Sequence, residues 1–528
     1  MNMRGGCLLL MLLLARMAFG QGVDLAFLQT RAEATGFAET TRYDEVMAFL
    51  DVLEASSHRI QVTRFGYTTE GRALPLVIYG NVVNATGDGV RAASAPLRVL
   101  ILANIHGGEV AGKEAALMLL RALAAGMYAE WADSLVLLVA PIYNADGNER
   151  INLYNRPLQN GPVGGMGQRA NAQGYDLNRD FMKADAPETR SLLRLLRAYD
   201  PHVFIDLHTT DGTYHAYPLT YAPPLHPSTP KPLVDYLRRV WLPAVNDTIW
   251  TKHRWKFFYY GNLPWPGSDR PPGWYTFDHR PRFGTNYVGL RGMLGLLSEA
   301  YAYATFEERI EATYAFLEAV LSFAAARASE IRALIEQARQ ASPVGEPIAL
   351  RARLDRAPEP ALILLGTVDS LRHPYTGQLM LQRRPEVLPE MLPLYDRFAP
   401  TETISIPRGY LVPPGLDRVR DLLEVHGIPC VPLEAGLTLE VERFRIDSVA
   451  VSDRPYQGHR GQEVWGTYER QTLTAPAGSC LVTVDGRTGR LAALLLEPRS
   501  DDGLVAWGLL EDRLAPGRYY PVARVPVR

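Results

Sequence analysis

Val99-Leu100-Ile101-Leu102-Ala103 decides the fold, together with the His106-Gly107-Gly108-Glu109 that follows it and the helix-like run over 111–125. A buried strand that leads through a glycine turn into a helix is typical of an α/β sheet, which carries its chemistry at the carboxyl ends of its strands. His106 and Glu109 can point to one centre, and an imidazole nitrogen with a carboxylate oxygen suits zinc. A solvated helix start, where the helix dipole favours Glu109, explains these four residues by themselves at least as well.

Apolar runs alternate with helix-like patterns through residues 41–340. This alternation favours an α/β fold with a largely parallel sheet. Residues 81–96 are expected to form a loop, and residues 214–286, rich in Pro, Gly, Tyr and Trp, are expected to carry binding loops or lids. The expected strands are 60–65, 74–79, 99–103, 135–140, 202–207 and 293–298, and the expected helices are 41–55, 111–125, 187–198 and 306–340.

The pattern changes after residue 341, where the Pro- and Gly-containing stretch 342–347 is typical of a linker. We therefore predict a first domain over residues 21–341 and a mixed, mostly β accessory region over residues 348–528. Cys430 and Cys480 both lie in this region, as a disulfide or as two buried thiols. Its expected strands are 361–366, 439–444, 448–451 and 479–484, and its expected helix is 416–426.

The N-terminus has the layout of a secretory signal peptide over residues 1–20, with Arg4, an apolar core over 7–14 and the small residues Ala18 and Gly20. We therefore expect export to the periplasm or the exterior. No later run reaches the roughly 18 apolar residues of a membrane helix, so no membrane span is expected in the mature chain. The net charge of −2 favours neither a nucleic-acid nor an anionic-membrane partner, and the oligomeric state stays open.

A catalytic zinc ion takes three protein ligands and leaves its fourth position to water, so His106 and Glu109 require a third ligand. His208 fits this requirement, because it directly follows the strand predicted over 202–207. The carboxyl ends of parallel strands meet at one edge of a sheet, where these ligands would gather. The rival candidates, none of which ends a predicted strand, are His202, His215 and His226.

Polar residues that could complete such a site occur in a Gly-rich loop between the supposed ligands. Asp176 could fix the ring of His106. Asn178 and Arg179 lie side by side, and an arginine grips a carboxylate through two parallel hydrogen bonds. A helix cap and a surface arginine are the alternative interpretation.

A hydrolytic zinc site also needs a base and a cationic donor. Glu299 follows the buried run 294–297, an unfavourable place for a charge without a partner, and could take the proton from water. Arg169 is available to stabilise the charge that develops on a substrate carbonyl. An exposed strand-end glutamate is the alternative for Glu299.

The combination resembles the M14 family of zinc carboxypeptidases over roughly residues 40–335. Gly174-Tyr175-Asp176-Leu177-Asn178-Arg179-Asp180-Phe181 is similar to that family's Gly-Val-Asp-Leu-Asn-Arg-Asn-Phe signature, and Asn144-Ala145-Asp146-Gly147 is similar to its Asn-Pro-Asp-Gly turn. The site residues that carry the resemblance, in chain order, are His106, Glu109, Arg169, Asn178, Arg179, His208 and Glu299.

The resemblance implies a mixed, mostly parallel eight-stranded sheet between helices, and an exported zinc metallocarboxypeptidase that acts on peptides or proteins with a free C-terminus. It implies one zinc ion per chain, held by His106, Glu109 and His208. It implies that Glu299 is the general base and acid and that Arg169 polarises the scissile carbonyl. Asn178 and Arg179 would hold the terminal carboxylate, and either Tyr275 or Tyr287 would cover the substrate.

Other functions remain open at this point. One is an N-acyl amino acid deacylase or a cell-wall peptide endopeptidase that uses the same zinc chemistry. Another is a catalytically silent peptide- or glycan-binding protein. Arg282 and Arg291 could favour acidic substrate side chains or form surface salt bridges. The accessory region could bind a partner or a glycan, or could support the first domain.

Overall fold

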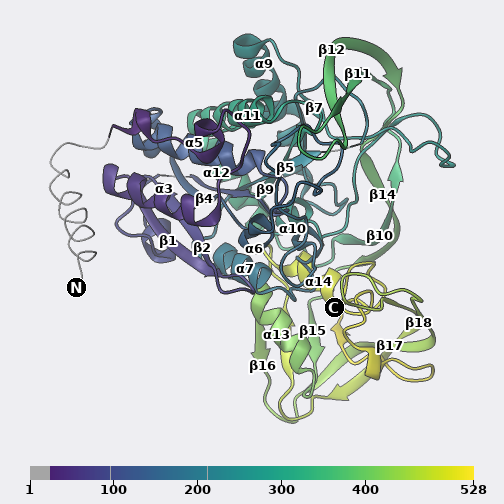
Figure 1. The fold of residues 1–528 in the computed structure, drawn as a ribbon. Helices are drawn as coiled ribbons and strands as arrows, with labels where there is room; N and C mark the ends of the chain where they lie inside the picture. Colours follow the sequence, from purple (N-terminus) through teal and green to yellow (C-terminus); the bar gives the residue numbers. More distant parts are fainter. Residues whose placement is uncertain (1–23, 96, 211, 528) are drawn as a thin grey trace, which may run out of the picture.

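A computed structural model describes residues 24–95, 97–210 and 212–527 (Figure 1). The predicted signal peptide, residues 1–20, lies outside the described residues. The centre of the fold is an eight-stranded sheet with the order β1-β2-β4-β3-β5-β9-β6-β7. Its strands are β1 (Ile60–Tyr67), β2 (Ala73–Tyr79), β3 (Leu97–Ala103), β4 (Leu135–Ala140), β5 (Val203–Thr210), β6 (Leu219–Ala222), β7 (Phe258–Tyr259) and β9 (Leu294–Tyr301).

The sheet is mixed, with a parallel centre. Strand β3 runs parallel to both β4 and β5, β5 runs parallel to β9, and β6 runs parallel to β7. The β1–β2, β2–β4 and β6–β9 pairs are antiparallel. Because parallel neighbours need crossover helices, the helices cover both faces of the sheet. The predicted mixed, mostly parallel eight-stranded sheet is confirmed.

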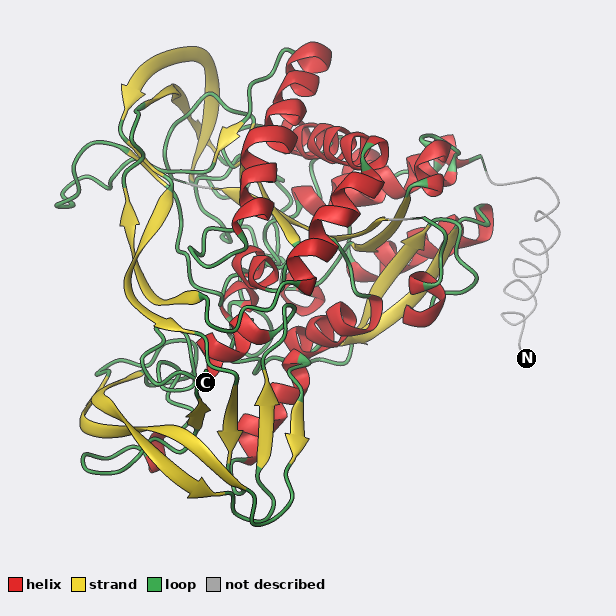
Figure 2. Ribbon diagram, turned by 180° about the vertical axis from the view of Figure 1, so that it is seen from behind, coloured by secondary structure: helices red, strands yellow, loops and turns green. Residues whose placement is uncertain are grey.

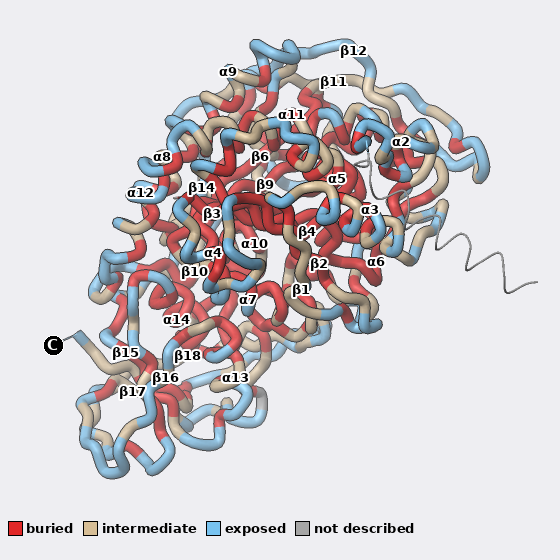
Figure 3. The backbone as a smooth tube through the Cα atoms, turned by 90° about the vertical axis from the view of Figure 1, so that its left-hand side faces the viewer, coloured by how far each residue is buried: buried red, intermediate tan, exposed pale blue. Residues whose placement is uncertain are grey.

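Alternate residues of each central strand enter two separate apolar clusters, as the twofold period of a strand requires. Val99 and Ile101 of β3 enter one cluster, and Leu100 and Leu102 enter the other. Figure 2 shows the helices gathered over the sheet, and Figure 3 shows the buried residues concentrated in its strands. Helices that contribute to the first cluster include α3 (Tyr43–Ser56), α5 (Ala111–Ala124), α9 (Leu242–His253), α11 (Phe306–Ala326) and α12 (Ala328–Gln340), and those that contribute to the second include α7 (Pro187–Tyr199) and α10 (Gly284–Leu290).

Several expected elements differ from the structure. The long helix expected over 306–340 is divided at Arg327, which leaves the helical conformation with φ of −126°. The expected loop 81–96 contains the short helix α4 (Gly87–Arg91). His208 and Glu299 lie inside β5 and β9 and not after them, because β5 and β9 pair as far as Thr210 and Tyr301. The remaining short elements before residue 341 are η1 (Leu25–Phe27), α2 (Arg31–Ala34), η2 (Ala129–Asp133), α6 (Ala145–Glu149), η3 (Leu177–Arg179), α8 (Lys231–Tyr236), η4 (Leu237–Trp241) and β8 (Trp274–Tyr275).

The C-terminal region is mostly β, as predicted. It begins with two antiparallel ribbons, β10 (Pro347–Asp355) with β14 (Arg397–Ser405), and β11 (Ala361–Arg372) with β12 (Leu379–Leu392). A second sheet follows, with the order β16-β19-β15-β20-β17-β18. Its strands are β15 (Gly409–Val412), β16 (Cys430–Pro432), β17 (Thr438–Val451), β18 (Gln462–Thr474), β19 (Cys480–Thr483) and β20 (Ala523–Val525), and the helices of the region are α13 (Asp417–His426), α14 (Gly489–Leu496) and η5 (Glu511–Arg513).

The C-terminal region and the first predicted domain share an apolar core. Helix α13 packs against α7 and α14 packs against α10 (Figure 1). Val419 and Leu491 of the C-terminal region belong to the same cluster as Leu100 of the central sheet. The short strand β13 (Leu394–Tyr395) pairs in parallel with β8 of the first domain. The C-terminal region is thus packed into the layer that covers one face of the eight-stranded sheet.

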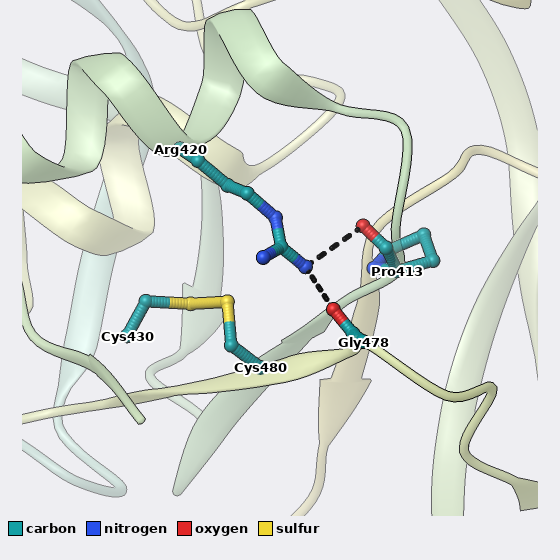
Figure 4. Close-up of a disulfide and its surroundings, with 5 residues drawn as sticks. All are labelled: Pro413, Arg420, Cys430, Gly478 and Cys480. Atoms are coloured by element: carbon teal, nitrogen blue, oxygen red, sulfur yellow. Dashed lines mark hydrogen bonds between the residues drawn. A yellow bond between two sulfur atoms is a disulfide. The ribbon is translucent and has the colours of Figure 1, made fainter. Parts of the chain in front are cut away.

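A disulfide joins Cys430 of β16 to Cys480 of β19, with a Cα–Cα distance of 5.5 Å (Figure 4). The two strands are antiparallel neighbours, and Cys430 is in register with Val482. Arg420 of α13 lies beside the bridge and donates to the carbonyls of Pro413 and Gly478. Among the described residues, no helix is long and apolar enough to cross a membrane.

Candidate metal centre and substrate cavity

The turn that carries His106 and Glu109 is held from inside by Asn104. This residue directly follows β3 and adopts a left-handed conformation with φ of 65°. Its side-chain amide donates to the carbonyls of His106 and Gly107, at 3.2 and 3.3 Å. The backbone N–H of Glu109 donates to the carbonyl of His106 at 2.9 Å, which closes the turn before α5 begins. Both side chains therefore face the carboxyl edge of the sheet.

Gly107 and Gly108 are required by close packing of the backbone. Neither has a positive φ. A Cβ at Gly107 would lie 2.3 Å from the carbonyl carbon of Gly147, and one at Gly108 would lie 2.5 Å from the carbonyl oxygen of Gly167. Contacts this short do not occur for real side chains, so any larger residue would displace the turn from the neighbouring loops.

His106, Glu109 and His208 converge on one point. The Nδ1 atom of His106 lies 2.9 Å from Oε1 of Glu109, and Nδ1 of His208 lies 2.9 Å from Oε2. All three residues are buried, and the ligand atoms that they offer lie within 4.8 Å of one another. Two imidazole nitrogens and one carboxylate oxygen are a donor set that zinc accepts in catalytic sites. The arrangement therefore fits a zinc ion with a further position for water.

Carboxylates hold the outer nitrogens of both rings. Nε2 of His106 lies 3.0 Å from Oδ1 of Asp176, and Nε2 of His208 lies 3.0 Å from Oδ2 of Asp206. Such contacts fix the ring orientation and leave Nδ1 for the metal. Although burial alone would raise the pKa of Asp176, the neighbouring His106, Arg169 and Arg179 hold it well below its usual range. Asp176 therefore stays ionised and can orient His106.

Arg156 is a site residue that the sequence did not reveal. Its guanidinium donates to Oε1 of Glu109 at 2.9 Å and to the carbonyl of Thr209 at 3.0 Å. Burial would raise the pKa of Glu109, but His106 and Arg156 hold it well below its usual range. The stem of Arg156 occupies the space beside Gly108, 2.9 Å from the position of a Cβ there. Arg156 is 47 residues away from Glu109 in the chain and reaches it only because its loop folds back. The local sequence around Arg156 therefore does not indicate this contact.

A cavity of about 220 Å³ opens at the three convergent residues. All seven site residues predicted from the sequence line it, which the fold achieves by bringing together β5, β9, η3, the loop before η3 and the turn after β3. Their catalytic and binding roles stay predictions. The lining residues are His106, Glu109, Arg156, Arg169, Asn178, Arg179, His208, Thr209, Thr210, Tyr260, Phe277, Phe283, Thr285, Leu297 and Glu299.

Strand register places Glu299 beside His208. The two residues are direct partners in the parallel β5–β9 pair, so their side chains leave the same face of the sheet. Leu297, two residues earlier on β9, points to that same face and also lines the cavity. Glu299 is therefore next to a predicted metal ligand and faces the space where a substrate would lie.

The 3-10 helix η3 presents Asn178 and Arg179 on another wall. The Asp176 side chain caps this helix by accepting from the backbone N–H of Asn178 at 2.9 Å. Oδ1 of Asn178 accepts from the backbone N–H of Gly284, also at 2.9 Å. The guanidinium of Arg179 lies 3.9 Å above the ring of Phe283, a geometry that keeps its remaining N–H groups available to a carboxylate.

Arg169 lies on the wall nearest to Glu109. Its Nη2 lies 2.9 Å from Oδ2 of Asp176, and its Nη1 lies 3.5 Å from Oε1 of Glu109. The side chain is 45% exposed, so its outer edge can still meet a substrate carbonyl.

The rival candidates lie elsewhere. His202, His215 and His226 do not line the cavity. Burial lowers the pKa of His202 to about 2 and that of His215 to about 3, so both are neutral. Tyr275 and Tyr287 also lie outside the cavity; the hydroxyl of Tyr275 donates to Pro271, and that of Tyr287 contacts His426. Tyr260, which sequence reasoning missed, directly follows β7 and is the cavity-lining tyrosine of the described chain.

The chain resembles known carboxypeptidases. Residues 46–253 match the family model described as zinc carboxypeptidase, Peptidase_M14. Carboxypeptidase 2 of Trichophyton rubrum is 25% identical over 520 residues, which cover 94% of this chain and 88% of the relative. Carboxypeptidase 2 of Trichophyton tonsurans is 25% identical over 519 residues, with the same two shares.

Over residues 46–253 the chain is similar to the M14 family of zinc carboxypeptidases. The resemblance inferred from its motifs is thereby confirmed, and with it the class of zinc metallopeptidases. The matched segment contains six of the seven predicted site residues, and Glu299 lies beyond it. A solved metallo-carboxypeptidase from Burkholderia cenocepacia is 20% identical, with a TM-score of 0.40 over 53% of this chain and 68% of that chain. Bovine thrombin-activatable fibrinolysis inhibitor is 14% identical, with a TM-score of 0.41 over 56% of this chain and 98% of that chain.

We expect the protein to bind one zinc ion per chain at His106, Glu109 and His208. Loss of a group that hydrogen-bonds to a metal ligand weakens metal binding roughly 10- to 100-fold. His208→Ala removes a ligand itself and should therefore weaken zinc binding by more than this. Metal analysis and competition with a chromogenic chelator measure this. His58→Ala, at an exposed histidine, is the matched control and should bind zinc like the wild type. Equal zinc affinity of the two variants would contradict the ligand assignment.

Proposed function

We propose that the protein is an exported metallocarboxypeptidase that hydrolyses the last peptide bond of peptides or proteins with a free C-terminus. The observation that carries the proposal is the single cavity that contains the His106, Glu109 and His208 cluster together with Glu299 and Arg179. A metal site, a proton acceptor and a carboxylate-binding arginine are the three parts that C-terminal hydrolysis requires, and all three face one space.

The chain's own residues divide the reaction as follows. Arg179 and Asn178 bind the terminal carboxylate, which places the last peptide bond near Glu109 and His208. Arg169 donates to the carbonyl oxygen as charge develops on it. Glu299 takes a proton from the attacking water as the new C–O bond forms, and gives it to the leaving amine as the C–N bond breaks. Zinc, when bound, supplies Lewis acidity that activates the water and polarises the carbonyl.

Export is supported by two independent features. Residues 1–20 have the composition of a secretory signal peptide. The disulfide between Cys430 and Cys480 is of a kind that persists in oxidising compartments and is rare in the cytosol. We therefore place the working protein in the periplasm or outside the cell.

The cavity favours apolar C-terminal side chains. Leu297, Phe277 and Phe283 contribute apolar wall. The three lining arginines, Arg156, Arg169 and Arg179, outnumber the two lining carboxylates, Glu109 and Glu299, so a cationic side chain would be disfavoured. Arg282 forms an ion pair with Asp502, and Arg291 donates to the carbonyl of His426, so neither reaches the cavity. The hypothesis that they select acidic side chains therefore has no support in the fold.

We expect a blocked dipeptide that ends in Phe to be hydrolysed at least about 10-fold faster, as kcat/KM, than the same peptide ending in Lys, because burying an unpaired ammonium beside arginines is costly. Steady-state kinetics with the two substrates measure the ratio. Equal kcat/KM for the Lys and Phe substrates would contradict the proposal that this cavity binds the C-terminal side chain and disfavours a cation.

Digestion of a peptide library, followed by mass spectrometry, tests the function itself. The proposal predicts ladders that shorten by one residue at a time from the C-terminus. Internal cleavage would indicate the endopeptidase alternative, and release of acyl groups without cleavage between amino acids would indicate the deacylase. Both outcomes contradict the proposal, as does an intact library in the presence of bound zinc.

A further inference from the structure

The loop between β17 and β18, residues 452–461, reaches from the C-terminal sheet to the substrate site. It connects the two strands of this long antiparallel ribbon, and it contacts the segment that precedes η3. Gln457, Gly458 and His459 are among the loop residues that contact the first domain. The C-terminal region is thereby in contact with the wall of the cavity that carries Asn178 and Arg179.

Gln457 holds the backbone of Asp176. Its side-chain oxygen accepts from the backbone N–H of Asp176 at 2.8 Å, across a separation of 281 residues. Gln457 adopts a left-handed conformation with φ of 49°, which is uncommon for a residue other than glycine. The fold maintains this conformation at the position where the side chain meets Asp176.

The neighbours of Gln457 strengthen the same contact. Gly458 lies against the ring of Tyr175, and a Cβ there would be 2.9 Å from the tyrosine hydroxyl. Nε2 of His459 lies 2.6 Å from Oδ2 of Asp185, on the far side of the segment that carries Asn178 and Arg179. The loop therefore holds this segment at both of its ends.

A second contact from the C-terminal region supports the opposite side of the carboxylate-binding pair. Oδ1 and Oδ2 of Asp502 accept from the Nε and the backbone N–H of Arg282, at 2.8 and 2.6 Å. The Cζ atom of the same guanidinium lies 4.5 Å from the centre of the Trp507 ring. Arg282 directly precedes Phe283, whose ring lies under Arg179. Both walls around Arg179 are thus fixed by residues beyond 450.

Asp176 transmits the effect of Gln457 to the reacting centre. Its carboxylate contacts the ring of His106, the guanidinium of Arg169 and the backbone N–H of Asn178. Nη1 of Arg179 also lies 3.9 Å from Oδ2 of Asp176. A shift of the Asp176 backbone would therefore change one predicted metal ligand and three predicted substrate contacts together. Placement within a few tenths of an ångström matters for such groups.

We propose that the C-terminal region is a positioning part of the substrate site, in which Gln457 and its loop hold Asp176 and thereby orient His106, Arg169, Asn178 and Arg179. This inference rests on the proposed carboxypeptidase function. It assigns a role to the accessory region, for which the sequence alone left partner binding, glycan binding and support equally open. The similarity to the Trichophyton rubrum relative extends over 94% of the chain and so includes this region.

The test is Gln457→Met, which keeps the length of the side chain and removes the acceptor. Gln471→Met is the matched control: Gln471 lies on β18 of the same ribbon, and its side chain contacts Tyr519, Glu469 and Arg443 within the C-terminal region. We expect Gln457→Met to raise KM for a blocked dipeptide about 5- to 10-fold, and to weaken zinc binding by the apoprotein about 10-fold, the lower end of an outer contact's effect. Gln471→Met should leave both quantities within twofold of the wild type.

Matching values of KM and zinc affinity in the two variants would overturn the proposal, whatever their melting temperatures. A second variant replaces residues 452–461 by Asn-Gly, a sequence that closes a two-residue hairpin. It should lose at least 100-fold in kcat/KM while the Cys430–Cys480 disulfide and the circular dichroism spectrum are retained; a folded variant of wild-type activity would again overturn the proposal. Inactivity of the zinc-loaded wild type on every C-terminal substrate would instead refute the proposed function.

Discussion

Glu299→Gln is expected to lower kcat by about two to four orders of magnitude, the range that a general base contributes. The amide has nearly the shape of the carboxylate but cannot accept the proton of the attacking water. Zinc binding should be unchanged, because His106, Glu109 and His208 are untouched. Steady-state kinetics on a blocked dipeptide and metal analysis of the same preparation measure the two quantities together.

Glu424→Gln provides the control for this substitution. Glu424 lies on the exposed side of α13, and the same change there should leave kcat within twofold of the wild type. If Glu299→Gln keeps both its zinc and its hydrolysis, Glu299 is not the base. Loss of zinc together with activity would also contradict the assignment, because it would make Glu299 part of the metal site.

Arg179→Met is expected to raise KM by about two orders of magnitude and to lower kcat/KM by about three. The loss of a buried, hydrogen-bonded charge pair typically costs 2–5 kcal/mol, which is roughly 30- to 5000-fold. Arg179→Lys should recover only part of this, since an ammonium cannot form two parallel hydrogen bonds with a carboxylate. The preference for a free carboxylate over a C-terminal amide should fall in parallel.

Arg194→Met is the matched control for Arg179→Met. Arg194 is exposed on α7, and its guanidinium is 3.4 Å from Ser191. Its KM should equal that of the wild type. An Arg179→Met enzyme that still prefers the free acid by the wild-type factor would show that another residue binds the terminal carboxylate.

The sequence was sufficient to predict the centre of the fold and the residues that meet in the cavity. The apolar run 99–103 is buried on both faces of a parallel sheet, and that environment produces an unbroken run that is easily recognised. The spacing of His106 and Glu109 follows from a single turn. The position of His208 follows from the neighbouring parallel strand, so local rules were enough to bring these three together.

Contacts that depend on the path of the chain could not be predicted. Arg156 reaches Glu109 only because its loop folds back beside Gly108, and Tyr260 reaches the cavity because it directly follows β7, a strand too short to show a periodic pattern. Gln457, in the loop between two strands of the C-terminal sheet, contacts Asp176, which is 281 residues away in the chain. No periodic pattern or turn signal encodes such an approach, because it depends on how complete layers pack.

The most direct measurement of the central claim compares two substrates on the zinc-loaded wild-type protein: a blocked dipeptide ending in Phe with a free carboxylate, and the same compound as its C-terminal amide. If Arg179 and Asn178 bind the terminal carboxylate beside the zinc site, the free acid should be hydrolysed at least about 100-fold faster, as expected for the loss of a buried charge pair. Equal cleavage of the acid and the amide would contradict the carboxypeptidase function.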